Sequence, residues 1–414
     1  MISKEKTPLN TILWIMVFDH ASLNMTFPIL TMVFFDPLSH IFTKLNSFEE
    51  RSLWYGVCIA IPHIMNIFFT PLLSSLSDDL GRKRILSLGV LGAIIFSLIA
   101  ALGVYKGSLV LLFIALIVRG IFSRTNPIGQ AIIGDISDKS SKVLNMGYLQ
   151  GAISIGAFLG PVIGGYFANR YFFSTLNFSL PFLLASFIAS ISLFITILYF
   201  KETITHKKKG GFFYHLNYKH LQKIIKYPDI STILIILLLT QVSWSIYYQY
   251  IPPILKTVFK LSANQLGIFI GLTAVWLTFT TMFGIKILQK YFNLKAMLKQ
   301  SIILILIGLI ITLLSLFTKL KFLIWIAAIP IAFGDVVAYS CLVALFSNLV
   351  NKNEQGKSMG ICFLIVATTW GLTGVVGGFI MSINIMLPII LAIIPLLIVF
   401  ILIKKRHLTP YLFL

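Results

Sequence analysis

Long runs of apolar residues recur along the whole chain, and short polar segments separate them. The runs are about 20 residues long, the length that an α-helix needs to cross the hydrocarbon core of a bilayer. They show no strict alternation of apolar and polar positions, so the pattern favours helices over the strands of a membrane barrel. Twelve spans are predicted, at roughly residues 11–35, 52–76, 85–104, 108–132, 143–168, 179–200, 229–255, 263–285, 298–318, 321–348, 357–381 and 384–403.

The composition agrees with this pattern. Hydrophobic residues make up 58% of the 414 residues, and charged residues make up 11%. A soluble domain of this size cannot bury so much apolar surface, so the predicted fold class is an all-α integral membrane protein. The first run, residues 11–35, is too long for the apolar part of a signal peptide and is expected to remain as a span.

The formal net charge of +20 is a signal of topology. Of the 33 Lys and Arg residues, 23 lie in the N-terminal segment and in the predicted loops on its side of the membrane, and 8 lie on the opposite side. Positive residues concentrate on the cytoplasmic side, so both termini are expected in the cytoplasm. Anionic lipid is expected to attract this charge, and nucleic acid is not expected as a partner.

A charged segment, residues 201–228, divides the spans into two sets of six. It predicts a cytoplasmic basic linker between an N-terminal six-helix bundle (residues 1–200) and a C-terminal six-helix bundle (residues 229–414). Six identities between the fifth and eleventh spans share a constant offset of 213 residues: Met146 with Met359, Gly147 with Gly360, Leu159 with Leu372, Val162 with Val375, Gly164 with Gly377 and Gly165 with Gly378. This repeat fits two pseudo-symmetric halves with substrate bound between them.

Residues 77–84 form a short charged segment between the second and third spans. The segment resembles the signature loop of the major facilitator superfamily, Gly-x-x-x-Asp-Arg-x-Gly-Arg-Arg/Lys. The positions in register are Asp78, Gly81, Arg82 and Lys83. Two positions depart from the family pattern, because Ser74 stands in place of the first Gly and Asp79 in place of the first basic residue. The resemblance implies a secondary transporter with the major facilitator fold.

The fifth span carries small residues at helical spacing, namely Gly156, Gly160, Pro161, Gly164 and Gly165. Such spacing lets helix backbones approach closely, and Pro161 removes one helical hydrogen bond. Ordinary packing of membrane helices explains the glycines alone. The full pattern with proline resembles the element that marks the antiporter branch of the superfamily.

Three further segments resemble tetracycline and multidrug proton antiporters. They are Phe18-Asp19 with Pro28, residues 134–138 with Lys142 and Gly147, and Lys201-Glu202-Thr203 at the end of the sixth span. Arg119 resembles the mid-span arginine of the family, but Ser123 replaces the glycine expected beside it, and Arg124 adds a second cation.

Ionisable residues inside the predicted spans are candidates for proton coupling, because charges within a bilayer are costly and usually face a cavity or each other. Asp19, beside His20 in the first span, is the first candidate; a static ion pair or a packing role is the alternative. Asp335 in the tenth span is the second candidate. The repeat places Asp335 one turn from the equivalent of Arg119, so the two are predicted to face each other across the cavity.

The seventh span places Gln241, Trp244 and Tyr248 on one face, which suits an amphipathic ligand. The alternative is an aromatic belt at the membrane interface. Cys58, Cys341 and Cys362 lie in spans without metal-ligand spacing and are expected to be packing residues, so neither a metal nor a cofactor is expected.

The charged loop also suggests a mechanism. Asp78 is predicted to accept hydrogen bonds from Arg82 and from the amides that begin the eleventh span, and Asp135 is predicted to compete for the same guanidinium. With Gly81 and Lys83, these residues form a predicted cytoplasmic latch that favours the outward-facing state.

The sequence therefore predicts a proton-coupled antiporter that exports an amphipathic, drug-like small molecule by alternating access. The alternative is a proton-coupled carrier of a specific metabolite, including siderophore export or nutrient uptake. A membrane enzyme or receptor is disfavoured, because no nucleophile elbow or phosphate-binding loop is present in the sequence. The expected protein is a monomer in a bacterial inner membrane, and its partners are the substrate, protons and lipid.

Overall fold

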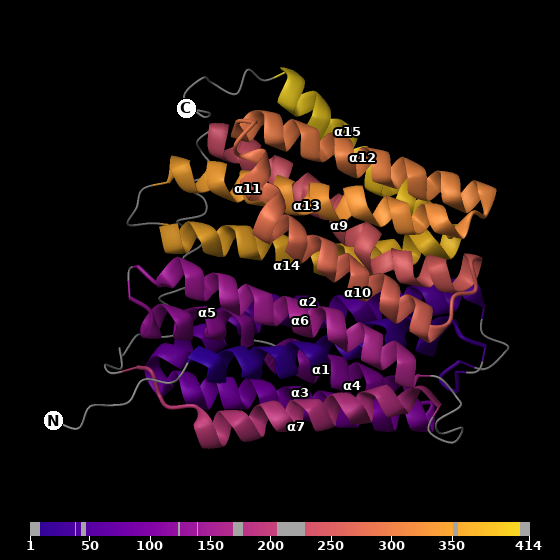
Figure 1. The fold of residues 1–414 in the computed structure, drawn as a ribbon. Helices are drawn as coiled ribbons and strands as arrows, with labels where there is room; N and C mark the ends of the chain where they lie inside the picture. Colours follow the sequence, from indigo (N-terminus) through magenta and orange to yellow (C-terminus); the bar gives the residue numbers. More distant parts are fainter. Residues whose placement is uncertain are drawn as a thin grey trace. The chain divides into compact units, whose positions relative to one another are not determined.

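The computed structural model describes residues 9–37, 39–42, 47–122, 125–138, 140–168, 177–204, 228–350 and 355–405. Within these ranges the secondary structure is helical, without a strand (Figure 1). The α-helices are α1 (Leu9–Phe35), α2 (Phe48–Leu80), α3 (Arg82–Lys106), α4 (Leu109–Phe122), α5 (Thr125–Ile136), α6 (Lys142–Phe167), α7 (Leu180–Tyr199), α9 (Pro228–Val258), α10 (Ala263–Phe279), α11 (Ile285–Leu288), α12 (Leu294–Thr318), α13 (Lys321–Leu349), α14 (Gln355–Ile383) and α15 (Leu387–Lys405). A 3-10 turn, η1 (Asn177–Ser179), precedes α7, and a π-helical turn, η3 (Thr280–Gly284), joins α10 to α11.

The predicted number of spans is confirmed. In the described part of the chain, 12 helical segments are long and apolar enough to cross a membrane. The fourth is formed by α4 and α5 together (Leu109–Ile136), and the eighth by α10, η3 and α11 (Ala263–Leu288). The all-α membrane fold expected from the hydrophobic pattern is therefore the fold of the protein. Most of the predicted linker, residues 205–227, lies outside the described residues.

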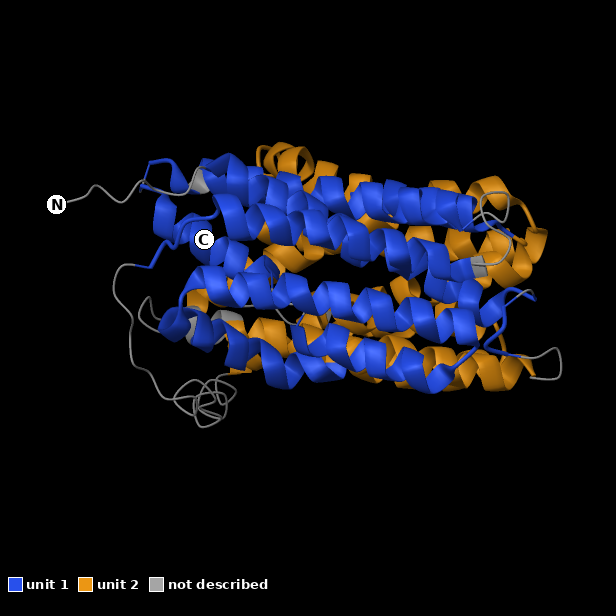
Figure 2. Cartoon of the chain, turned by 90° about the horizontal axis from the view of Figure 1, so that it is seen from below, with its two compact units in different colours: residues 1–46, 64–216, 261–274 blue, residues 47–63, 217–260, 275–414 orange. Residues whose placement is uncertain are grey.

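The chain forms two compact units (Figure 2). Unit 1 comprises residues 1–46, 64–216 and 261–274, and unit 2 comprises residues 47–63, 217–260 and 275–414. Two helices are divided between the units: the first part of α2 belongs to unit 2, and the first part of α10 belongs to unit 1. In unit 1, α1 contacts α3, α5, α6 and α7, and most of its residues are buried. In unit 2, α9 packs against α13, α14 and α15.

The glycines of α6 bring two helix backbones together in unit 1. A Cβ atom added at Gly156 would lie 2.6 Å from the carbonyl oxygen of Val17, and one added at Gly160 would lie 2.9 Å from the amide nitrogen of Met25. Gly164 faces Met25 as closely. A side chain at any of these glycines would collide with the backbone of α1, which explains why the contact requires glycine.

The repeat predicted from sequence has a counterpart in packing. Gly165 of α6 faces the start of α10, where an added Cβ would lie 3.1 Å from the Cα of Asn264. Its repeat partner, Gly378 of α14, faces the start of α2, where an added Cβ would lie 2.8 Å from the Cα of Gly56. The second and eighth spans are themselves six spans apart. Each unit therefore contains the same close contact between equivalent helices.

Candidate functional site

Within the charged segment between the second and third spans, a single residue separates two helices. The sequence predicts the end of the second span near residue 76, but α2 continues to Leu80 and α3 begins at Arg82. Gly81 alone interrupts them, with a φ of 107° and a ψ of 148°. A residue with a side chain is strained at this φ, and an added Cβ would lie 2.9 Å from the carboxyl carbon of Glu202. Gly81 is therefore required by its conformation and by its surroundings.

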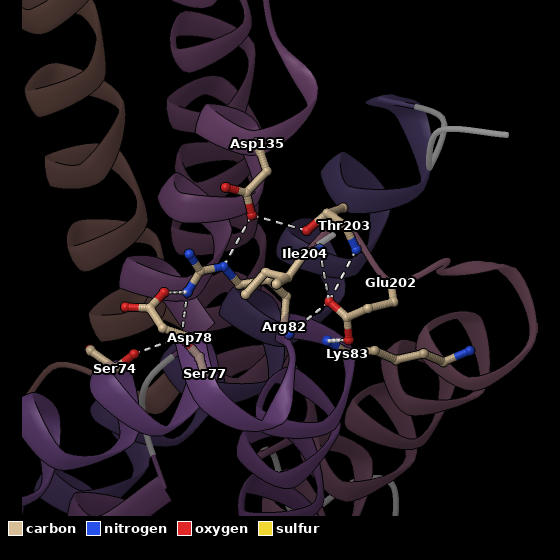
Figure 3. Close-up of polar contacts among 9 residues, drawn as sticks. All are labelled: Ser74, Ser77, Asp78, Arg82, Lys83, Asp135, Glu202, Thr203 and Ile204. Atoms are coloured by element: carbon tan, nitrogen blue, oxygen red, sulfur yellow. Dashed lines mark hydrogen bonds and ion pairs between the residues drawn. The ribbon is translucent and has the colours of Figure 1, made fainter. Parts of the chain in front are cut away.

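The guanidinium of Arg82 joins two carboxylates (Figure 3). Its Nη1 lies 2.6 Å from Oδ1 of Asp78 and donates to the hydroxyl of Ser77 over 2.5 Å, while its Nε donates to Oδ2 of Asp135 over 3.1 Å. The side chain of Arg82 is 11% exposed, whereas those of Asp78 and Asp135 are 50% and 27% exposed. A planar, permanently charged donor can bridge two acceptors in this way, and an ammonium group cannot reproduce its geometry.

The carboxylate of Glu202 caps the start of α3. It accepts hydrogen bonds from the backbone N–H of Arg82 at 2.9 Å and of Lys83 at 3.2 Å (Figure 3). It also accepts from the N–H groups of Thr203 at 3.0 Å and Ile204 at 3.2 Å. The first N–H groups of a helix have no partner within the helix, and a negative charge is favourable there. Glu202 supplies both the acceptor and the charge.

Two more contacts tie the segment after α7 to the same cluster. The hydroxyl of Thr203 donates to Oδ2 of Asp135 over 3.0 Å, and the ammonium of Lys83 donates to the carbonyl of Ile197 over 2.8 Å. The cluster thus fastens the ends of α2, α3, α5 and α7 to one another within unit 1. We call Asp78, Arg82, Asp135, Glu202 and Thr203 the loop cluster.

Asp78 and Asp135 contact Arg82 at the same time, whereas competition between them for its guanidinium was expected from the sequence. The contacts of Glu202, Thr203 and Ser77 were not predicted. The motif Lys201-Glu202-Thr203 was available as a signal. However, a cap normally comes from a residue adjacent to the helix, and this one comes from 120 residues away. The predicted contact of Asp78 with the start of the eleventh span concerns the two units together and stays a prediction.

Asp19 lies on α1 in the interior of unit 1. Its side chain is fully buried, and its Oδ2 accepts a hydrogen bond of 2.5 Å from the hydroxyl of Thr125 on α5. Its Oδ1 is buried without a hydrogen-bond partner, as is Nε2 of the neighbouring His20. Charge and unsatisfied polar atoms are costly in such surroundings. Asp19 and His20, which are adjacent on α1, therefore each keep one buried polar atom without a hydrogen bond.

Arg119 lies near the end of α4 and is held by neutral groups. Its guanidinium donates to the hydroxyl of Thr26 and to the carbonyl of Leu23, both over 3.4 Å, and lies 5.3 Å from the centroid of the Phe96 ring. Asp335 lies on α13 in unit 2, 7% exposed, with Oδ1 buried and unpartnered. The predicted relationship between Arg119 and Asp335 joins the two units and stays a prediction.

Many polar and aromatic side chains of the seventh span, α9, are buried, and Tyr248 is partly buried. Gln241 is 4% and Trp244 is 7% exposed, and the ring centroids of Trp244 and Tyr248 lie 5.2 Å apart. Trp244 and Tyr248, which were predicted to share a helix face, have their rings in contact. Among the described residues, no group of three or more His, Cys, Asp or Glu side chains is arranged to hold a metal ion.

Comparison with known proteins identifies the family. The sequence profile described as the Major Facilitator Superfamily matches residues 12–377. The chain belongs to this superfamily. Its fold, the 12 candidate spans in the described part of the chain and this membership make it a multi-pass integral membrane transporter. Superfamily membership also explains the register of Asp78, Gly81, Arg82 and Lys83 with the signature loop.

The curated relatives of this superfamily transporter include drug-resistance proteins. The chain is 31% identical to the class H tetracycline resistance protein of Pasteurella multocida over 195 residues, 46% of this chain and 44% of that protein. It is 22% identical to the quinolone resistance protein NorA of Staphylococcus aureus over 361 residues, 85% of this chain and 87% of that protein. The chain thus spans less than half the length of the tetracycline resistance protein that it matches.

Solved structures of other transporters share the fold. The nucleoside transporter NupG has a TM-score of 0.74 at 11% identity and covers 96% of this chain and 97% of its own. The D-xylose-proton symporter has a TM-score of 0.71 at 14% identity and covers 94% of this chain and 95% of its own. At these identities the likeness concerns the fold alone.

Proposed function

We propose that this transporter is a proton-coupled antiporter that exports an amphipathic, drug-like small molecule by alternating access. The observation that carries the proposal is the environment of Asp19. A fully buried carboxyl on α1, with one oxygen held by Thr125 and the other without a partner, has a site for a proton that neighbouring groups leave open. Because charge is costly there, gain and loss of this proton can change which state of the transporter is favoured.

The names of the relatives support export of a drug. The proteins that the chain resembles include tetracycline, quinolone and multidrug resistance proteins. The antiporter element of the fifth span, Gly156 to Gly165, is consistent with the same branch, although its described contacts are those of close packing. Superfamily members with similar loops carry different cargo, so the substrate must be found by assay.

We propose that the loop cluster acts as the cytoplasmic latch. Arg82 holds Asp78 and Asp135, and Asp78 is half exposed, which leaves its carboxylate accessible for a second contact. In this proposal that second contact is with the start of the eleventh span, and it favours the outward-facing state. Asp335 is the second candidate for the proton, and Arg119, His20 and Gln241 are assigned to the substrate cavity.

We also propose that both termini lie in the cytoplasm of a bacterial cell and that the protein acts as a monomer in the inner membrane. The proposed domains are an N-terminal bundle (1–200), a basic linker (201–228) and a C-terminal bundle (229–414). The asymmetry of Lys and Arg along the loops supports the orientation.

Transport by proteoliposomes tests the proposed function. Purified protein is reconstituted with an inside-acid pH gradient, and uptake of tetracycline, a fluoroquinolone and ethidium is measured with and without a protonophore. Accumulation that the protonophore abolishes is the expected result. Absence of gradient-driven accumulation for the whole panel contradicts drug export, and substrate movement in the same direction as protons supports the metabolite carrier instead.

A further inference from the structure

The junction between the eighth and ninth spans presents lysines and apolar side chains together on the surface of unit 2. The helical path continues past the end of α11, because the N–H of Lys290 donates to the carbonyl of Ile287 over 3.2 Å. Phe283, Ile287 and Tyr291 follow at intervals of four residues and are 52%, 52% and 76% exposed. Lys286 and Lys290 are also four residues apart and exposed. We call these five residues the basic surface.

Positive charge exceeds negative charge at this end of unit 2. Asp229, at the start of α9, is the one described carboxylate here, and no further Asp or Glu occurs in the sequence before Asp335, in the middle of α13. Lys299 of α12 and Lys404 of α15 are exposed at the same end, because these packed helices are the ninth and twelfth spans and run in opposite directions. Neither lysine of the basic surface forms an ion pair with a described residue. The surface therefore attracts anions.

The equivalent loop of unit 1 neutralises its cation with carboxylates of the chain itself. There Arg82 lies between Asp78 and Asp135, and its side chain is 11% exposed. The repeat offset of 213 residues places Tyr291 at the position of Asp78 and Asn348 at the position of Asp135. The loop of unit 2 thus carries lysines but neither of these carboxylates. An anion from outside the chain can supply the negative charge instead.

We propose that the basic surface binds an anionic phospholipid of the cytoplasmic leaflet. The ammonium groups of Lys286 and Lys290 bind the lipid phosphate, and the exposed side chains of Phe283 and Ile287 contact the acyl chains. Tyr291 lies at the level of the headgroups, where an amphipathic ring is favourable. Lysines gain from the negative potential of an anionic leaflet, and the apolar side chains favour a lipid over a free phosphate ion. The inference goes beyond the proposed antiport and uses only the proposed orientation of the chain.

Binding of fluorescent phosphatidylglycerol tests the site. Full-length protein in a neutral detergent is mixed with a short-chain, dye-labelled phosphatidylglycerol, and the fluorescence anisotropy of the lipid is measured; the phosphatidylcholine analogue is the lipid control. The double variant Lys286→Gln/Lys290→Gln is expected to bind phosphatidylglycerol about tenfold more weakly than wild-type protein, with unchanged binding of phosphatidylcholine. Lys319→Gln/Lys321→Gln is the matched control, because it removes two exposed lysines from the opposite end of unit 2. It should bind phosphatidylglycerol as tightly as wild-type protein.

Competitors and the oligomeric state separate the lipid from other occupants. Inorganic phosphate and glycerophosphoglycerol, which has the headgroup but no acyl chains, are expected to compete at least about tenfold less well than unlabelled phosphatidylglycerol. Equal competition would overturn the lipid site, as would equal phosphatidylglycerol binding by the two double variants. A wild-type dimer that Lys286→Gln/Lys290→Gln converts to a monomer, measured by light scattering, would assign the surface to a second copy and also overturn it. Phosphatidylglycerol binding that depends on these lysines, in a protein without proton-driven transport, would refute the proposed antiport and leave the lipid site intact.

Discussion

The Nε atom of Arg82 lies 3.1 Å from Oδ2 of Asp135, so the first residue of α3 is joined to the last turn of α5. The same guanidinium holds Asp78 in the last turn of α2, and the same Asp135 oxygen accepts the hydroxyl of Thr203 after α7. The guanidinium thereby joins the ends of α2, α3 and α5, and Asp135 links them to the segment after α7. Arg82 is well placed to transmit a change at any one of these ends to the other three.

Replacing Asp78 by Asn tests the latch. The substitution removes the negative charge that faces Nη1 of Arg82 at 2.6 Å but preserves the shape of the side chain. We expect transport to be abolished while the amount of protein in the membrane stays normal, as measured by drug accumulation in cells and by immunoblot. Asp138→Asn removes an equal charge from the same end of unit 1, beyond the contacts described for Arg82, and should leave transport intact. Normal transport by Asp78→Asn would rule the latch out.

Replacing Glu202 by Ala tests the helix cap. The change leaves the N–H groups of Arg82 and Lys83 without their acceptor, and loss of a helix cap typically costs about 1 kcal/mol. We expect a lower unfolding temperature for the purified protein in detergent, and weaker transport because Arg82 is less well fixed. Glu202→Gln keeps an acceptor oxygen, so its unfolding temperature should lie between those of the wild-type protein and Glu202→Ala. Equal unfolding temperatures for all three proteins would show that the cap has no stabilising role.

Two glycines of α6 provide a matched pair for testing the contact with α1. An alanine methyl at position 156 would lie 2.6 Å from the Val17 carbonyl oxygen, whereas one at position 151 would meet nothing within 4 Å. We expect Gly156→Ala to destabilise the protein by about 1–3 kcal/mol through overpacking. Gly151→Ala should be neutral or stabilise by up to about 1 kcal/mol, because alanine is the better helix former. Thermal unfolding of both variants measures the difference, and a Gly156→Ala variant as stable as Gly151→Ala would contradict the packing.

The sequence predicted the spans well, because the bilayer imposes a length and a polarity that can be read residue by residue. It also led us to expect that Asp78 accepts hydrogen bonds from Arg82, and the two side chains are in contact. The sequence did not predict where α2 ends. The charged residues after position 76 suggested a loop, but α2 continues to Leu80, and Asp78 in its last turn pairs with Arg82, the first residue of α3.

Contacts between distant segments were the part that the sequence could not give. Glu202 and Arg82 are separated by 120 positions, and no local rule connects a carboxylate after one span with the start of another. The polar and aromatic face of α9 is a similar case: helical periodicity predicted the face, but the ring that lies beside Tyr248 is that of Trp370 on α14. Periodicity shows which residues share a helix face, whereas the partner of that face depends on tertiary packing.

Proton-driven accumulation by the Asp19→Asn variant tests the central claim most directly. Asn keeps the size of the side chain and can still accept from Thr125, but it cannot take up and release a proton. In proteoliposomes with an inside-acid gradient, we expect the variant to lose accumulation of substrate. Exchange of substrate across the membrane without a gradient should persist, because it requires no proton. Proton-driven accumulation by Asp19→Asn at the wild-type level would remove Asp19 from the coupling step.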